Sequence, residues 1–189
     1  KLFRLVTVLN VGVIGYSGDI YKEPIKSLTS ICLEIGKCIA KNNWILVNGG
    51  RDGVMHLVSK AAKNNGGYVI GYLPWGEEGN EYLTLPIKTG LDFNMRSFIM
   101  LKNVDAVVSL GGEIGTAIEI LGAYSYKKPI ILFRNTGGWT DNITKILIEE
   151  KYLDNRKLIE LRQVYKVTEM EIALKEIESE MDSIIIKEI

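Results

Sequence analysis

Short uncharged segments rich in β-branched residues alternate along this chain with segments of helical periodicity, and this alternation restricts its fold more than any other feature. The predicted strands are 6–14, 44–47, 68–73, 86–89, 105–110, 129–133 and 164–167. The intervening segments repeat their apolar residues three and four positions apart, as between Ile25 and Ile39. Strands joined through helices pair in parallel with right-handed crossovers. We therefore predict an α/β, Rossmann-like, doubly wound and mostly parallel sheet of six or seven strands, with helices on both faces.

The composition is that of a globular domain with no bias toward nucleic acid. Of the 189 residues, 47% are hydrophobic, and 23 basic residues balance 23 acidic ones. Such a chain can bury a core, and its zero net charge argues against a broad surface for a phosphate backbone. We expect one domain over residues 1–189, with the functional motifs within 6–150 and a closing helix over 168–182. We expect no nucleic-acid partner.

Membrane, metal and disulfide sites are not expected. The longest uncharged run, 5–18, is too short for a membrane span, which favours a cytoplasmic protein without a membrane partner. Cys32 and Cys38 lie on one predicted helix and point in different directions, so we expect buried thiols. The single histidine, His56, cannot build a zinc site of two or three histidines. We expect neither a metal nor a cofactor.

Glycine-rich or polar loops follow several predicted strands, at 15–18, 49–53, 91–96 and 111–116. In a doubly wound sheet the carboxyl ends of the strands share one edge, where ligands bind. Two of these loops lead directly into helices, whose first N–H groups attract an anion. Tight turns also need glycine, but two such loops at one edge favour phosphate binding. Neither loop has a Walker A sequence or the dinucleotide fingerprint, so ATPase and dehydrogenase activities are not expected.

Two charged residues stand among apolar neighbours on predicted helices. Glu119 follows Thr116 by one helical turn, in a mostly apolar helix. Arg96 lies in the first turn of a helix that Asn94 is expected to cap, where a cation opposes the helix dipole. A buried acid needs a hydrogen-bond or charge partner, or else has a functional role. A guanidinium in apolar surroundings favours contact with a carboxylate or a phosphate. The alternatives are a simple helix-start acid and an exposed surface arginine.

In combination, three motifs resemble those of the lonely-guy phosphoribohydrolases. They are Gly49-Gly50-x-x-Gly53-x-Met55, Met95-Arg96-x-x-x-Met100 and Gly111-Gly112-x-x-Gly115-Thr116-x-x-Glu119. They occur in the expected order within residues 6–150. The same superfamily includes the molybdenum cofactor carrier proteins and, distantly, the DNA-processing protein A family. Many members carry the label "putative lysine decarboxylase"; because the pocket motifs contain no lysine for pyridoxal phosphate, we do not expect that activity.

The resemblance implies a Rossmann-like protein that forms a homodimer or a higher homo-oligomer and binds a nucleotide or another phosphorylated small molecule. In the hydrolase branch, the N-glycosidic bond of a nucleoside 5'-monophosphate is split to a free base and ribose 5-phosphate. By this resemblance Arg96 and Glu119 form the catalytic pair. The resemblance also implies that Gly111, Gly112, Gly115 and Thr116 hold the phosphate. Together with the other loops at this edge of the sheet, the predicted phosphate- or nucleotide-binding residues are Gly15, Ser17, Gly49, Gly50, Gly53, Met95, Gly111, Gly112, Gly115 and Thr116.

The sequence departs from the hydrolase pattern at two places. Leu110 stands where the hydrolases have proline, and the Glu113-Ile114 pair makes the following loop one residue longer. Ser97 stands where they have a lysine after the arginine. The longer loop is closer to the carrier branch and changes the N–H groups available to a phosphate. Two functions stay open: a nucleoside-monophosphate hydrolase, and a non-catalytic carrier or sensor of a nucleotide-like or molybdopterin-like ligand. A pure interaction domain is a third alternative.

Overall fold

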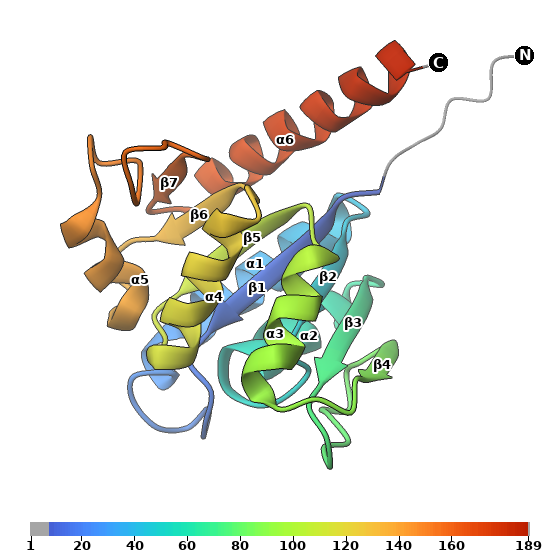
Figure 1. Cartoon of the computed structure of the whole chain (residues 1–189). Helices are drawn as coiled ribbons and strands as arrows, with labels where there is room; N and C mark the ends of the chain where they lie inside the picture. The colour runs from blue at the N-terminus through green and yellow to red at the C-terminus, as the bar shows by residue number, and fades with distance from the viewer. Residues whose placement is uncertain (1–7, 189) are drawn as a thin grey trace, which may run out of the picture.

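A seven-stranded parallel sheet forms the centre of the protein (Figure 1). The structure is a computed structural model, and it describes residues 8–188. The strands are β1 Asn10–Gly15, β2 Ile45–Asn48, β3 Tyr68–Leu73, β4 Leu85–Lys88, β5 Ala106–Leu110, β6 Ile130–Phe133 and β7 Leu161–Val164. Their order in the sheet is β4-β3-β2-β1-β5-β6-β7, and every neighbouring pair is parallel. The predicted Rossmann-like α/β fold is confirmed. Residues 6 and 7 of the first predicted strand lie outside the described residues.

Helices cover both faces of the sheet. They are α1 Thr29–Lys41, α2 Gly53–Asn64, α3 Phe93–Lys102, α4 Ile114–Ser125, α5 Gly138–Asn142 and α6 Val167–Glu188, with two short 3-10 helices, η1 Lys26–Leu28 and η2 Ile143–Ile146. One core cluster joins α1, α2 and α6 to the sheet. A second cluster joins α3 and α4 to the opposite face, which is the nearer face in Figure 1.

Strand β5 shows why the central strands read as continuous apolar runs. All five of its residues are buried. Ala106, Val108 and Leu110 pack in the first core cluster, whereas Val107 packs in the second. Successive side chains of a strand point to opposite faces, so a strand covered by helices on both sides needs apolar residues at consecutive positions.

Three predicted boundaries near the carboxyl end are corrected by the structure. The closing helix predicted over 168–182 is α6 Val167–Glu188, and the last strand is Leu161–Val164 rather than 164–167. The sequence after Thr140 also predicts a helix to Glu150, but in the structure α5 ends at Asn142 and is followed by η2. The chain leaves the helix because Ile143 and Leu147 pack into the second core cluster, and tertiary packing outweighs local periodicity there.

Asp92, not Asn94, caps helix α3. The Asp92 carboxylate accepts hydrogen bonds from the backbone N–H groups of Asn94 and Met95, at 2.8 and 2.9 Å. An aspartate at the N-cap satisfies N–H groups that have no partner within the helix. Asn94 was therefore placed wrongly as the cap, since it lies two residues further along and already belongs to the first turn.

The strand order creates a crevice beside β1. From β1 the chain builds β2, β3 and β4 on one side, and then crosses to β5, β6 and β7 on the other. The direction in which strands are added to the sheet therefore reverses at β1, and we call this position the switch point. The loops after β1, β2 and β5 begin at the carboxyl ends of three adjacent strands beside it. A ligand in a doubly wound sheet binds in such a crevice. No helix within residues 8–188 combines the length and the apolar character needed to cross a membrane.

Candidate functional site

A cavity of about 140 Å³ lies at the carboxyl ends of the central strands. Four segments form its walls: the end of β1, the loop between β2 and α2, the first turn of α3, and the loop between β5 and α4. The residues that line it are Val13, Ile14, Gly15, Ser17, Gly49, Arg51, Met55, Phe93, Asn94, Arg96, Ser97, Glu113, Gly115, Thr116, Ile118 and Glu119. The cavity therefore unites segments from separate sequence motifs at the switch point of the sheet.

Arg96 places a buried cation in the wall of this cavity. Its exposed fraction is 5%, and its Nε atom has no hydrogen-bond partner among the described residues. Burial lowers the pKa of the guanidinium, although the nearby negative charge of Glu119 acts in the opposite direction. Burying a charged donor without a partner is costly, so an arginine in this state is suited to receive an anion.

Gly49 leaves the space that the Arg96 guanidinium occupies. A Cβ atom at position 49 would lie 2.1 Å from Nη1 of Arg96 and 2.7 Å from the sulfur of Met55. Both distances are shorter than a van der Waals contact. Any side chain at position 49 would therefore displace the Arg96 guanidinium from its present position. The need for glycine here arises from close packing against Arg96, not from an unusual backbone angle.

Glu119 contacts Ser97 directly. The Ser97 Oγ atom lies 2.8 Å from Oε1 of Glu119 and 3.1 Å from the carbonyl oxygen of Phe93, so its single proton can be donated to either acceptor. Burial raises the pKa of the Glu119 carboxyl, while the Ser97 hydrogen bond and the charge of Arg96 oppose that rise. Arg96 and Glu119 line the same cavity, but no ion pair joins them in the described part of the chain.

The first turn of α4 presents free backbone donors to the cavity. The N–H groups of Glu113, Ile114 and Gly115 have no acceptor within residues 8–188, and Glu113 at the N-cap provides no side-chain hydrogen bond. The Thr116 hydroxyl lies 3.3 Å from the carbonyl oxygen of Gly15, which joins the start of α4 to the end of β1. Free N–H groups at a helix start form a favourable place for an anion.

The residues implied in nucleotide binding fall into two groups. Five of them line the cavity: Gly15, Ser17, Gly49, Gly115 and Thr116. The remaining five do not line it: Gly50, Gly53, Met95, Gly111 and Gly112. The Met95 side chain is 52% exposed on the surface of α3. The structure thus brings together only part of the implied set.

The glycines outside the cavity shape the loops around it. A Cβ atom added at Gly53 would lie 2.2 Å from the Tyr16 carbonyl oxygen, and one added at Gly111 would lie 2.0 Å from the Tyr16 ring. A Cβ atom added at Gly112 would lie 2.1 Å from Oγ1 of Thr116. At Gly50 it would lie 2.7 Å from a Leu73 methyl group. Each of these four residues also has a positive φ angle, between 57° and 90°. Their structural role is to allow the chain to approach itself closely.

Several lining residues are not among the predicted site residues. Arg51 lies in the 49–53 loop but is not in the predicted binding set, and Ser97 is noted only as a departure from the family pattern. Phe93 lines the cavity and also lies beneath the Arg51 guanidinium, 4.8 Å from Cζ to the ring centroid. One available signal was the position of Arg51 inside a glycine loop that precedes a helix. Within residues 8–188, no group of three or more histidine, cysteine or acidic side chains is placed to hold a metal ion.

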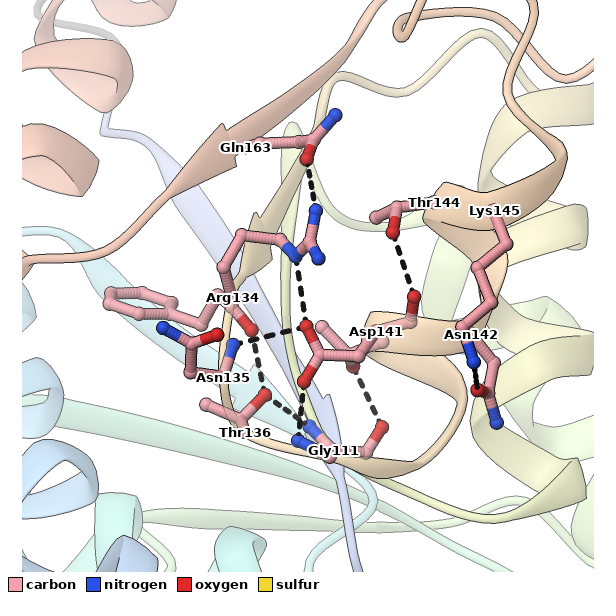
Figure 2. Close-up of polar contacts among 12 residues, drawn as sticks. Gly111, Arg134, Asn135, Thr136, Asp141, Asn142, Thr144, Lys145 and Gln163 are labelled. Atoms are coloured by element: carbon pink, nitrogen blue, oxygen red, sulfur yellow. Dashed lines mark hydrogen bonds and ion pairs between the residues drawn. The ribbon is translucent and has the colours of Figure 1, made fainter.

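The segment after β6 holds the Gly111-Gly112 loop in place (Figure 2). The Gly111 N–H donates to Oγ1 of Thr136 at 2.9 Å, and the Thr140 hydroxyl donates to the Gly111 carbonyl at 2.7 Å. The Trp139 N–H donates to the Gly112 carbonyl at 2.8 Å. Bonds from both sides thus fix the peptide groups that lead into α4.

Asp141 organises this supporting segment. Its carboxylate accepts hydrogen bonds from Nε of Arg134 at 2.8 Å and from the backbone N–H groups of Asn135 and Gly137 at 3.0 and 2.6 Å (Figure 2). Arg134 also donates to Gln163 on β7. Burial alone would raise the pKa of Asp141, but these bonds and the charge of Arg134 outweigh it and lower the pKa below its ordinary value.

The lowered pKa predicts how Asp141 affects stability as a function of pH. A carboxyl whose pKa is lower in the folded state stabilises the protein above its unfolded pKa and loses that effect as the pH falls through the folded pKa. We expect Asp141→Asn to lower the free energy of unfolding by about 2 kcal/mol at pH 7, with a smaller difference below about pH 4. Urea unfolding of both proteins across this range measures it, with exposed Asp19→Asn as the control. A difference that is independent of pH would contradict the role of the ionised carboxylate.

Replacing Gly115 with alanine is expected to weaken phosphate binding without lowering the free energy of unfolding. A Cβ atom at this position would meet nothing within 4 Å, and its φ angle lies outside the positive range. The residue lies in the first turn of α4 and lines the cavity. We expect Gly115→Ala to keep or raise the free energy of unfolding, by up to about 1 kcal/mol from helix propensity, while its methyl group weakens phosphate binding. Unfolding and binding titrations check this; unchanged binding would remove Gly115 from the site.

Taken together, the fold and the cavity define a Rossmann-like α/β protein with a pocket at the switch point of its sheet. Comparison with known proteins gives the family: the chain belongs to the SLOG cluster4 family, whose sequence model matches residues 8–168. The resemblance inferred from the three motifs is confirmed.

Two solved structures and one curated relative are closely similar. The X-ray structure of the protein TM1055 is 54% identical, with a TM-score of 0.88, and the match covers 89% of this chain and 99% of that one. The molybdenum cofactor carrier protein of Chlamydomonas reinhardtii is 30% identical, with a TM-score of 0.75, covering 92% and 99%. A probable cytokinin riboside 5'-monophosphate phosphoribohydrolase of Oryza sativa subsp. japonica is 30% identical over 68% of this chain, and the match spans 61% of that relative's length.

Proposed function

We propose that this protein binds a phosphorylated, nucleotide-like small molecule at the switch-point cavity and hydrolyses the N-glycosidic bond of a nucleoside 5'-monophosphate. The observation that carries this proposal is the buried Arg96 guanidinium without a hydrogen-bond partner at Nε, in the same cavity as Glu119. The similarity to the rice phosphoribohydrolase supports the reaction. The free N–H groups at the start of α4 support the phosphate as the group that is held.

In the proposed reaction, Glu119 assists the cleavage of the N-glycosidic bond by water. When the bond between the ribose C1' and the base nitrogen breaks, its electrons leave with the base and the sugar becomes oxocarbenium-like. The ionised Glu119 carboxylate stabilises that positive charge and orients the attacking water. The water loses one proton as the new C1'–O bond forms, and the departing base takes up one proton from solvent, so that water is added across the broken bond. Ser97 holds the carboxylate through the hydrogen bond at 2.8 Å. The products are a free base and ribose 5-phosphate.

A carrier or sensor function is the second candidate, favoured by specific observations. The match to the Chlamydomonas carrier protein covers 99% of that chain, whereas the match to the rice hydrolase covers 61%. Ser97, where the hydrolases carry a lysine, leaves Glu119 with a neutral hydrogen-bond donor, and burial raises the pKa of the Glu119 carboxyl. A carboxyl that resists ionisation is a weaker catalytic base. In this alternative the cavity holds a nucleotide-like or molybdopterin-like ligand without reaction.

One experiment separates the two functions. The protein is incubated with a panel of nucleoside 5'-monophosphates, and release of free base is followed for the wild type and for Glu119→Gln. Turnover that the variant loses by about 100-fold or more supports the hydrolase. Saturable binding without turnover supports the carrier, and no affinity for any phosphorylated ligand rejects both.

The pH dependence of turnover gives a further expected result. Only the ionised Glu119 can stabilise the sugar cation, and burial raises the pKa of this carboxyl while Arg96 lowers it. Turnover should therefore rise with pH through a pKa above the usual glutamate value of about 4.3. Full turnover persisting below that value would show that ionised Glu119 is not required.

A homodimer or a higher homo-oligomer is part of the proposal. Helices α3 and α4 lie side by side on one face of the sheet (Figure 1). They expose apolar side chains: Met95, Ile99, Ile114 and Leu121 are between 42% and 64% exposed. Exposed apolar side chains gathered on neighbouring helices are typical of a subunit interface. Sedimentation should show a dimer or a higher oligomer at micromolar concentration, and a monomer would contradict this expectation.

A further inference from the structure

Arg51 forms a wall between two adjoining hollows. On one side it lines the switch-point cavity together with Arg96 and Glu119. On the other side it lines a second hollow of about 260 Å³, whose other residues are Asp52, His56, Glu77, Gly79 and Asn80. Its side chain is 28% exposed, so its guanidinium is accessible from solvent as well as from the cavity. The function proposed above uses no group on this side of the cavity.

The backbone of Arg51 is fixed, whereas its guanidinium is held by weak contacts. The Asn80 amide donates to the Arg51 carbonyl at 2.8 Å. The guanidinium lies over the Phe93 ring and has its Nε atom 3.4 Å from a Glu77 carboxylate oxygen. Both contacts are partly exposed, and ion pairs of that kind hold a side chain weakly. A ligand anion can therefore replace Glu77 at the guanidinium without disturbing the loop.

The topology sets Arg51 and the start of α4 on opposite sides of β1. Arg51 follows β2, and the free N–H groups of Glu113, Ile114 and Gly115 follow β5. Strands β2 and β5 are the two neighbours of β1 in the sheet. Arg96, which also lines the cavity, comes from α3. The cavity thus has two separate positions that attract negative charge, in addition to the buried guanidinium.

Electrostatics makes this arrangement unfavourable without a ligand. Burial lowers the pKa of Arg96, and the charge of Arg51 lowers it further, against the opposing effects of Glu119 and Glu77. The acids that face the cavity are Glu113 and Glu119, and burial favours the neutral form of the latter. Two guanidiniums near one cavity repel each other, and an anionic ligand relieves that repulsion.

We propose that Arg51 binds a second anionic group of the ligand, across the cavity from the phosphate held at the start of α4. This inference rests on the proposed function and names its substrate class: a nucleotide-like molecule with two anionic groups, bound more tightly than a simple monophosphate. Arg51 is then a specificity-determining residue. When no ligand is bound, the Glu77 carboxylate pairs with the Arg51 guanidinium.

The test compares three probes that share one base: adenosine 5'-monophosphate, adenosine 5'-diphosphate and adenosine 3',5'-bisphosphate. Their affinities are measured by calorimetry for the wild type, Arg51→Gln and Glu77→Gln. We expect the wild type to bind at least one of the doubly phosphorylated probes about tenfold more tightly than the monophosphate, as one charge-assisted contact allows. Arg51→Gln should abolish that preference, so that the variant binds all three probes with affinities within about threefold of one another. Glu77→Gln should enlarge the preference, because the competing carboxylate is gone.

Controls and outcomes keep this inference separate from the proposed function. Arg156→Gln removes the same charge at an exposed turn, where Arg156 pairs with Asp154, and should leave all three affinities unchanged. Thermal unfolding checks that Arg51→Gln remains folded. If the monophosphate is bound or hydrolysed but neither doubly phosphorylated probe is preferred, the inference is wrong and the proposed function stands. An equal preference in the wild type and Arg51→Gln also overturns it, and no binding of any probe rejects both.

Discussion

Replacing Arg96 with methionine is expected to reduce the affinity for a nucleoside 5'-monophosphate by about 100-fold or more while the protein stays folded. The guanidinium is 5% exposed, and its Nε atom has no partner in the described part of the chain. A charge-assisted contact in a desolvated site is among the strongest single contacts to a phosphate. Methionine retains much of the side chain's volume but removes the charge. Binding titration with the monophosphate measures the loss.

The free energy of unfolding of Arg96→Met should not fall together with its affinity for the monophosphate. Removing one partner of a buried ion pair usually destabilises a protein by several kcal/mol, because the other charge is left alone. Arg96 has no direct ion-pair partner within residues 8–188, so methionine removes the desolvation cost and loses only the longer-range attraction between Arg96 and Glu119. We expect an unchanged or higher free energy of unfolding for Arg96→Met. Arg156→Met, at an exposed position, is the matched control for both measurements. A variant that unfolds readily, or binds normally, would show that Arg96 serves the fold instead.

Replacing Gly53 with alanine is expected to lower the free energy of unfolding by about 3 kcal/mol or more. Its φ angle is +61°, a conformation that costs other residues about 1–2 kcal/mol. A Cβ atom there would also lie 2.2 Å from the Tyr16 carbonyl oxygen. That carbonyl cannot simply move away, because it accepts a hydrogen bond from the Val54 N–H at 2.9 Å. Overpacking against backbone therefore adds to the strain. Urea unfolding measures the change.

Gly66→Ala is the matched control for Gly53→Ala. Gly66 also has a positive φ angle, +79°, but nothing lies within 4 Å of the position of its Cβ. Its substitution should therefore show the backbone strain alone, a loss of about 1–2 kcal/mol. The difference between the two variants isolates the contact with Tyr16. Equal losses would mean that the start of α2 can shift to relieve the clash, and that Gly53 is not needed for the path of this loop.

The fold was predictable because its signals are local and repeated. Strand β5 is apolar at nearly every position, and this predicted burial on both faces before any neighbour was known. The errors occur where tertiary packing competes with periodicity. Residues near Ile143 and Leu147 resemble a helix in sequence, but they leave it to fill the second core cluster. The cap of α3 was misplaced by two residues, because Asp92 and Asn94 are both good capping residues and only the backbone decides between them.

The site was predictable in its location but not in its contacts. The rule that strand ends share one edge predicts that the loops containing Gly49 and Gly115 lie together, and both line the cavity. The partner of Glu119 was not predictable. The family resemblance implies Arg96 as its partner, whereas in the structure its carboxylate accepts a hydrogen bond from the Ser97 hydroxyl at 2.8 Å. Which of two neighbouring residues on α3 faces α4 depends on the rotation of that helix, which its own sequence does not determine.

The chain by itself determined the layers, the parallel direction of its strands and the edge at which polar loops gather, because hydrophobic periodicity and glycine turns act over a few residues. Only the tertiary structure decided which glycines face a cavity and which make room for Tyr16 and Thr116. It alone also placed Arg51 opposite the start of α4 and left Arg96 buried without a partner at Nε. These features depend on distances between segments far apart in sequence, which packing around the whole sheet sets.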